Sequence, residues 1–300
     1  MAWHQLSIIA NKATAPEISD FFNALGAVSV TYMDAEDHPV YEPAPGETRI
    51  WDNTKIIALF ETDAEPELVK KLLFSTFSKQ PISNWQQEFL DDQVWERAWM
   101  EHFRPMKFAD RLWVCPTGQE ISEPDTACMT LDPGLAFGTG THPTTELCLE
   151  WLAENDIKGK TFIDYGCGSG ILAIAAALLG AEKVFAVDID PQALTATYDN
   201  AVKNNVQSQI IISDADEFSP ILADILIANI LAQPLMELSE YLSKMVKTNG
   251  QLILSGILKE QTSPVIDCYR QNFYFNVPIY AEDWCRLDAV KKIKPSAENR

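Results

Sequence analysis

The sequence predicts an α/β protein with two domains, a small N-terminal α+β domain and a larger domain with a mainly parallel sheet. The chain has 300 residues, near the size at which one hydrophobic core divides into two. Its first part reads as strand, helix, strand, strand, helix, strand, which is the ferredoxin-like order. Its second part alternates short apolar strands with helices, as in parallel sheets that helices cover on both faces.

Composition limits the class of protein. Hydrophobic residues make up 47% of the chain and charged residues 22%, which excludes a disordered or fibrous chain. No apolar run reaches the roughly 18 residues of a membrane span, and no export signal is visible, so we expect a cytoplasmic protein without a membrane partner. The net charge of −20 argues against direct nucleic-acid binding and favours a basic partner. The alternative is that the protein is simply acidic, as many cytosolic proteins are.

The cysteines and histidines do not form a metal-binding pattern. The sequence contains no Cys-x-x-Cys pair and no His-Glu-x-x-His motif, and it has only four histidines. We therefore expect no metal site, and free thiols in a reducing compartment. The six cysteines stand at positions 115, 128, 148, 167, 268 and 285.

Residues 1–90 are expected to form the small domain. Residues 1–103 hold 17 acidic and 7 basic residues, a net charge of −10 in one third of the chain, so this part is the more acidic per residue. Apolar periodicity of two residues in the strands and of three to four in the helices defines the elements. In order, they are a strand at Leu6–Ile8, a helix from Pro16 to Gly26, a strand at Val28–Tyr32, a strand at Lys55–Glu61, a helix at Pro66–Phe77 and a weaker strand at Trp85–Leu90.

A linker helix is expected at 91–104, where Asp92 can cap its first turn; an ordinary surface helix is the alternative. Residues 105–293 are expected to form the large domain, and residues 294–300 a disordered tail. The last two expected strands have no helix-length gap between them, so we expect an antiparallel hairpin at the edge of the sheet. The strands of the large domain are expected at Thr161–Asp164, Lys183–Asp188, Gln209–Ile212, Asp224–Ala228, Gln251–Ser255, Phe273–Tyr280 and Trp284–Lys291.

A glycine-rich turn joins the first of these strands to an apolar helix. It reads Asp-Tyr-Gly-Cys-Gly-Ser-Gly from Asp164 to Gly170, and glycines let a ligand approach main-chain N–H groups closely. A dinucleotide fingerprint would carry glycine at the sixth position counted from Gly166, where Ile171 stands. The carboxylate of Asp164 would also repel a pyrophosphate, whereas it would attract an ammonium group.

Acidic residues follow the next two strands. Asp188 lies 22 residues after Gly166, where a carboxylate that binds a ribose diol is expected. Asp214, one strand later, can accept a hydrogen bond from an adenine amino group. Asp190 and Asp216 are better interpreted as helix caps or solvated loop residues. Carboxylates for a diol and an amino group, without a phosphate clamp, match S-adenosylmethionine.

Two further motifs accompany this set. The stretch Leu131–Thr145 contains three glycines and four threonines, so it can fold over a cofactor or simply cap the following helix. Thr144 or Thr145 can bind the carboxylate of the cofactor, and Phe137 can cover its sulfonium or ring. His142, before a proline, is interpreted as structural rather than as a base.

Asn229 follows the fourth expected strand, where the strand end meets the reactive side of the cofactor. An amide oxygen at this place can accept a hydrogen bond from an incoming amine and orient its lone pair for in-line displacement.

Together these segments resemble the methyltransferase family that acts on ribosomal protein eleven of the large subunit. The resemblance extends over nearly the whole chain. It rests on Pro39–Pro43, Trp95–Met100, Leu131–Thr145, Asp164–Gly170, Asp188–Pro191, Asn229–Leu231 and the pair Trp284 and Cys285.

The resemblance implies a class I S-adenosylmethionine-dependent enzyme with a seven-stranded Rossmann-like sheet and an N-terminal domain that recognises the substrate. It implies trimethylation of lysine ε-amines and of the N-terminal α-amine of that basic ribosomal protein. It places cofactor contacts at Thr145, Gly166, Asp188 and Asn229, with Phe137, Gly138, Asp164, Gly168 and Asp214 as further candidates.

Since a methyl sulfonium is already a strong electrophile, we expect no metal, no covalent intermediate and no dedicated side-chain base, with Asn229 positioning the amine. Three alternatives remain open from the residues alone. They are a methyltransferase of the same fold with another substrate, a nicotinamide oxidoreductase, and a non-catalytic module that retains the cofactor fold. Ile171 and Asp164 argue against the oxidoreductase.

Overall fold

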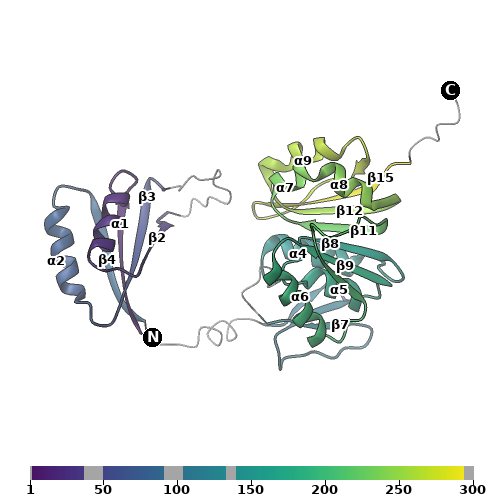
Figure 1. Cartoon of the computed structure of the whole chain (residues 1–300), viewed down its shortest axis with the longest axis horizontal. Coiled ribbons are helices and arrows are strands. Elements are labelled where there is room, and N and C mark those ends of the chain that lie inside the picture. Colours follow the sequence, from purple (N-terminus) through teal and green to yellow (C-terminus); the bar gives the residue numbers. More distant parts are fainter. Residues whose placement is uncertain (1, 37–49, 91–103, 133–139, 294–300) are drawn as a thin grey trace. The chain divides into compact units, whose positions relative to one another are not determined.

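The computed structural model describes residues 2–36, 50–90, 104–132 and 140–293. The chain forms two compact units, Met1–Trp95 and Glu96–Arg300 (Figure 1). The expected linker helix at 91–104, apart from Arg104, and the expected tail at 294–300 lie outside the described residues. No helix in the described ranges is long and apolar enough to cross a membrane.

In its described residues, the first unit is a four-stranded antiparallel sheet with two helices. The strands lie in the order β2-β3-β1-β4, and every neighbouring pair is antiparallel. The chain order of strands and helices agrees with the sequence prediction, although β4 is longer than the weak strand expected there. The elements are β1 (Trp3–Asn11), α1 (Ala15–Ala24), β2 (Ser29–Asp34), β3 (Asn53–Phe60), α2 (Pro66–Thr76) and β4 (Ile82–Leu90).

Alternation along the strands explains how this unit buries its core. Leu6 and Ile8 of β1 are fully buried, and so are Phe22 of α1 and Leu73 of α2. These side chains belong to one apolar cluster, because every second residue of a strand faces the same side and the helices cover that side.

The second unit is built on an eight-stranded mixed sheet. The strand order is β10-β9-β8-β11-β12-β15-β13, and β14 also pairs with β15. The strands from β10 to β12 are parallel, whereas β15 is antiparallel to its three neighbours. The strands are β8 (Thr161–Tyr165), β9 (Lys183–Asp188), β10 (Ile210–Asp214), β11 (Ala223–Asn229), β12 (Val246–Leu258), β13 (Phe273–Phe275), β14 (Ile279–Ala281) and β15 (Trp284–Lys291).

Helices pack on both faces of this sheet (Figure 1). One face carries α4 (Pro143–Glu154), α5 (Ile171–Leu178) and α6 (Pro191–Lys203). The other carries α7 (Ala232–Glu237), α8 (Ser239–Met245) and α9 (Thr262–Tyr269). The two faces have separate apolar clusters, as expected for parallel strands that are buried on both sides.

The end of the chain differs from the prediction in two ways. The single strand expected at Phe273–Tyr280 is two short strands, β13 and β14, with Pro278 between them; proline has no N–H to donate and interrupts a ladder. The expected antiparallel hairpin at the edge of the sheet is confirmed, but β15 is its inner strand and lies between β12 and β13, with β14 also paired to it. Its nearly continuous burial from Trp284 to Leu287 is typical of a strand that is paired on both sides. The sheet therefore has one strand more than the seven expected.

A three-stranded sheet was not predicted. It consists of β5 (Met106–Phe108), β6 (Leu112–Cys115) and β7 (Ala127–Thr130), in the order β5-β6-β7. Leu112, Val114 and Met129 are fully buried and join the apolar cluster on the α4–α6 face. These strands are only three or four residues long, so their sequence shows little periodicity.

Candidate cofactor site

The carboxyl ends of five neighbouring parallel strands bring polar residues to one edge and one face of the sheet. Asp214 is the register partner of Asp188, Asn229 is that of Ser255, and Asp164 pairs with Ile227, two residues before Asn229. The residues two positions before these polar residues face the α4–α6 cluster. Because side chains alternate along a strand, the polar residues share that face. They are Asp164, Asp188, Asp214, Asn229 and Ser255.

The glycine turn between β8 and α5 is built for close approach. The N–H groups of Gly166 and Cys167 both donate to the carbonyl oxygen of Val187, at 2.7 and 3.0 Å. Gly166 has a φ of 80°, and a Cβ added there would lie 2.2 Å from the Cγ2 atom of Ile230. A larger residue at this position would therefore displace the segment that follows Asn229.

Helix α6 holds the other side of this turn. The hydroxyl of Thr197 donates to the carbonyl oxygen of Gly168 at 3.0 Å, and the amide of Asn200 donates to that of Ser169 at 2.9 Å. Sequence reasoning missed both residues. Their spacing of three on one helix was the only available signal, and it is shared by any pair of residues on one helical face.

Asp188 is held by two main-chain donors. One carboxylate oxygen accepts from the N–H of Gly168 at 2.8 Å, and the other accepts from the N–H of Asp190 at 3.0 Å. Each oxygen keeps a lone pair, so the carboxylate is oriented and can still accept from a diol. Asp190 caps α6 by accepting from the N–H of Gln192 at 2.9 Å, as the sequence indicated.

Asp214 lies beside Asp188 at the end of β10. One of its oxygens accepts from the N–H of Asp216 at 2.8 Å. Asp216 itself is exposed, in agreement with its interpretation as a solvated loop residue.

Asp164 is completely buried and only partly satisfied. Its Oδ2 atom accepts from the N–H of Ala173 at 3.0 Å, and its Oδ1 atom has no hydrogen-bond partner within the described residues. Burial raises the pKa of Asp164 to about 7, and the charge of Asp188 adds to this increase. The hydrogen bond from Ala173 acts in the opposite direction but is the weaker effect. A buried acceptor without a partner is costly, so this oxygen fits a donor supplied by a ligand.

Asn229 and Thr145 meet across β11 and α4. The Nδ2 atom of Asn229 donates to the hydroxyl of Thr145 at 3.4 Å, and Thr145 is 1% exposed. The Oδ1 atom of Asn229 is buried and has no partner in the part of the chain that the structure describes. The structure thus brings together two sequence-predicted residues that are 84 positions apart, and it leaves one amide oxygen open to an incoming group.

His142 has a structural role. It is the N-cap of α4: its Nδ1 atom lies 2.8 Å from the hydroxyl of Thr144 and accepts from the N–H of Thr144 at 3.4 Å. Its ring packs edge-on against Trp284 at a centroid distance of 5.0 Å. Burial lowers the pKa of His142 below its usual value, although Glu282 opposes this. The other two candidates of this stretch, Phe137 and Gly138, lie outside the described residues.

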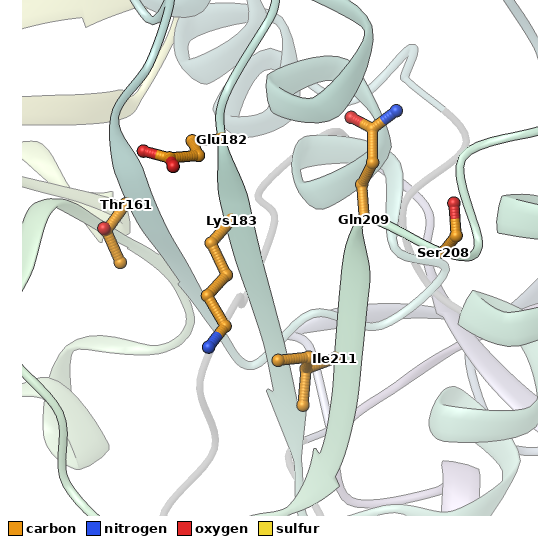
Figure 2. A pocket seen from close by; sticks show the side chains of 6 residues that line it. All are labelled: Thr161, Glu182, Lys183, Ser208, Gln209 and Ile211. Atoms are coloured by element: carbon orange, nitrogen blue, oxygen red, sulfur yellow. The ribbon is translucent and has the colours of Figure 1, made fainter.

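A separate pocket lies at the opposite end of the same strands (Figure 2). It has a volume of about 460 Å³ and includes the first residues of β8 and β9, so it is at their amino ends. None of the predicted site residues lines it. Its lining residues are Thr161, Glu182, Lys183, Ser208, Gln209 and Ile211. In the described ranges, no group of three or more His, Cys, Asp or Glu residues has the arrangement of a metal site.

Comparison with known proteins identifies the family of this chain. The model of the family described as ribosomal protein L11 methyltransferase (PrmA) matches residues 2–292. A protein of that name from Tolumonas auensis is 49% identical over 293 residues, covering 97% of this chain and all of the relative. One from Methylococcus capsulatus is 49% identical over 291 residues, covering 97% of this chain and 99% of the relative.

A solved structure agrees in fold. The crystal structure of ribosomal protein L11 methylase from Lactobacillus delbrueckii subsp. bulgaricus is 31% identical, with a TM-score of 0.58 over 64% of this chain and all of that chain. The glycine turn, the open oxygens of Asp164 and Asn229, and the carboxylate of Asp188 fit a cationic nucleoside without phosphate. The chain belongs to the ribosomal protein L11 methyltransferase family, which depends on S-adenosylmethionine.

Proposed function

We propose that this chain transfers methyl groups from S-adenosylmethionine to amino groups of ribosomal protein L11, namely lysine ε-amines and the N-terminal α-amine, up to trimethylation. The relatives at 49% identity are named as ribosomal protein L11 methyltransferases, which supports L11 as the substrate. An amine as the nucleophile is supported by the Oδ1 atom of Asn229, which is buried and has no hydrogen-bond partner among the described residues. An uncharged acceptor can orient an amine without strongly stabilising its ammonium form.

Each residue of the site is proposed to contact a different part of the cofactor. Asp188 would accept from the ribose hydroxyls and Asp214 from the adenine amino group. The open oxygen of Asp164 would accept from the methionyl ammonium, and the hydroxyl of Thr145 would contact the methionyl carboxylate. Gly166 and Gly168 allow the close approach, and Phe137 and Gly138 are proposed to cover the cofactor. When bound, the cofactor supplies a methyl sulfonium that is electrophilic without further activation.

The main barrier that the chain must address is therefore on the nucleophile. A lysine with a pKa of about 10.4 is neutral in about one molecule in 2,500 at pH 7, a cost of roughly 4.6 kcal/mol. An α-amine costs only about 1–1.4 kcal/mol. His142 is engaged as a helix cap, so we propose that water exclusion around Asn229 lowers the pKa of the amine and that no side chain serves as the base.

The acidic charge of the chain supports a basic substrate. The net charge is −20, and residues 1–103 contribute half of it. We propose that these residues attract the basic ribosomal protein, that the reaction takes place in the cytoplasm, and that nucleic acid is not contacted directly. The affinity for the substrate should then decrease as salt increases. If the affinity for the substrate is the same at low and at physiological salt, electrostatic attraction does not contribute to substrate recognition.

The test is transfer of labelled methyl groups from S-adenosylmethionine to purified ribosomal proteins, followed by mass spectrometry of the labelled chain. We expect label on L11, on amines only, with up to three methyl groups per amine. Label on a different ribosomal protein, or on a small amine and not on L11, would contradict the proposed substrate. Binding of a nicotinamide dinucleotide in place of S-adenosylmethionine would contradict the chemistry.

A further inference from the structure

Strand β12 supports Asn229 from the neighbouring position in the sheet. Ser255 is the register partner of Asn229 and lies on the same face. Its side chain is completely buried, and its hydroxyl oxygen lies 3.2 Å from the carbonyl oxygen of Thr144 and 3.4 Å from that of Cys285. The hydroxyl can donate to one carbonyl at a time, and the shorter distance favours Thr144.

That carbonyl belongs to the peptide unit that leads into Thr145. The peptide lies in the first turn of α4, where the N–H of Thr145 also donates to the carbonyl oxygen of His142 at 2.9 Å. Fixing the carbonyl of Thr144 therefore limits where the hydroxyl of Thr145 can lie. This hydroxyl is the partner of the Asn229 side-chain amide at 3.4 Å. A continuous series of contacts thus runs from Ser255 through Thr144 and Thr145 to Asn229.

A second constraint acts on the main chain next to Asn229. A Cβ added to Gly256 would lie 2.3 Å from the carbonyl oxygen of Ile230 and 2.8 Å from its carbonyl carbon. On the other side, a Cβ added to Gly166 would lie 2.2 Å from the Cγ2 atom of Ile230. Ile230 therefore packs between two glycines, so the main chain cannot shift easily and the orientation of the amide depends on the contact with Thr145.

We propose that Ser255 is a positioning residue of the methyl transfer: its hydroxyl fixes the Thr144–Thr145 peptide, and that peptide orients the amide of Asn229 toward the amine. This rests on the proposed role of Asn229. Ser255 itself touches neither the amine nor the cofactor in this account. Misplacement of a positioning group by a fraction of an ångström lowers turnover, whereas cofactor affinity depends on several contacts of the site, of which the Thr145 hydroxyl is only one.

The test begins with Ser255→Ala. We expect kcat to fall by a factor of about ten, while the cofactor dissociation constant changes by less than about twofold. Ser243→Ala is the matched control: Ser243 is 4% exposed, its hydroxyl has no partner within the described ranges, and it lies in α8 on the other face. This variant should keep the wild-type kcat. Thermal unfolding of both variants shows whether they fold.

The decisive measurement is a double-mutant cycle with Asn229→Ala. If Ser255 acts through Asn229, Ser255→Ala should have no further effect on kcat in the Asn229→Ala background. Additive losses, or an unchanged kcat in Ser255→Ala alone, would overturn the positioning role and leave the proposed function intact. A normal kcat in Asn229→Ala alone would instead overturn the role of Asn229, and the positioning role with it. Absence of methyl transfer by the wild-type chain would overturn the proposed function itself.

Discussion

Two aspartates on parallel strands of the same sheet differ in how well their hydrogen-bond acceptors are satisfied. Asp224, at the amino end of β11, accepts with one oxygen from the N–H of Thr161 and from the ammonium of Lys247, both at 2.9 Å. Asp164, at the carboxyl end of β8, is buried with one hydrogen bond and one open oxygen within the described residues. Burial acts to raise the pKa of Asp224, but the hydrogen bonds from Thr161 and Lys247 outweigh it and hold that pKa below its usual value.

The difference supports the carboxyl end of the parallel strands as the proposed ligand site. At the amino end, Asp224 already has Lys247 as its cation and the N–H of Thr161 as its donor. Thr161 also lines the pocket at this end (Figure 2). At the carboxyl end, Asp164 and Asn229 each have a buried oxygen without a partner among the described residues, which costs stability unless a ligand supplies a donor. In open α/β sheets this is also the end at which ligands bind.

The largest effect that tests this comparison is expected from Asp188→Ala. It removes the two charge-assisted hydrogen bonds proposed to the ribose, each worth about 1.5–3 kcal/mol, so cofactor affinity should fall about a hundredfold or more. Isothermal titration calorimetry measures it. Asp190→Ala is the matched control, since it removes only a helix cap and should leave the affinity unchanged. An unchanged dissociation constant for Asp188→Ala would refute the ribose assignment.

Asp164 should make the stability of the free chain depend on pH. Its pKa is about 7 when folded, against about 3.9 when unfolded, so the folded chain binds the extra proton. This contribution to stability is fully present below about pH 4 and is lost as pH rises through about 7, a change of about 4 kcal/mol. Urea unfolding at several pH values measures it.

Asp164→Asn should flatten that pH dependence, because the amide does not ionise. Bound S-adenosylmethionine should also reduce it in the wild-type chain, because a cationic group next to Asp164 favours the ionised form. Equal pH dependence of the wild-type and variant chains would show that Asp164 is not the group responsible. An unchanged pH dependence with cofactor would place the ammonium elsewhere.

His142→Ala should have a smaller effect, on stability only. The variant loses the cap of α4 and the ring contact with Trp284, a cost of about 1 kcal/mol. The plot of turnover rate against pH should keep its shape, because His142 is not the base in the proposed mechanism. If an ionisation visible in the wild-type profile disappears in the variant, a histidine base exists and the proposed mechanism is wrong.

The smallest effect is expected at the amino end. Lys247→Met removes the ion pair with Asp224, whose side chains are 41% and 30% exposed, so stability should fall by no more than about 1 kcal/mol. Cofactor affinity and turnover should not change. If Lys247→Met lowers cofactor affinity as much as Asp188→Ala does, the cofactor site is not confined to the carboxyl end of the strands.

Much of the site could be predicted because its signals are local. The glycine turn after Asp164, the acidic end of β9 at Asp188 and the cap at Asp190 each depend on a few consecutive residues, whose backbone preferences are encoded nearby. Asn229 was placed at a strand end by the same logic. Thr197, Asn200 and Ser255 were missed, since their partners lie 29, 31 and 111 positions away.

The sequence by itself determined the chain order of most strands and helices and the polar residues at the strand ends, because hydrophobic period and turn chemistry act over short distances. Only the tertiary structure decided that β15 lies between β12 and β13, that three short strands join the core, and which polar atoms stay open. Strand order and hydrogen-bond satisfaction depend on contacts between distant segments. Those contacts also decide that Asp164 and Asn229, buried alike, each keep one oxygen without a partner among the described residues.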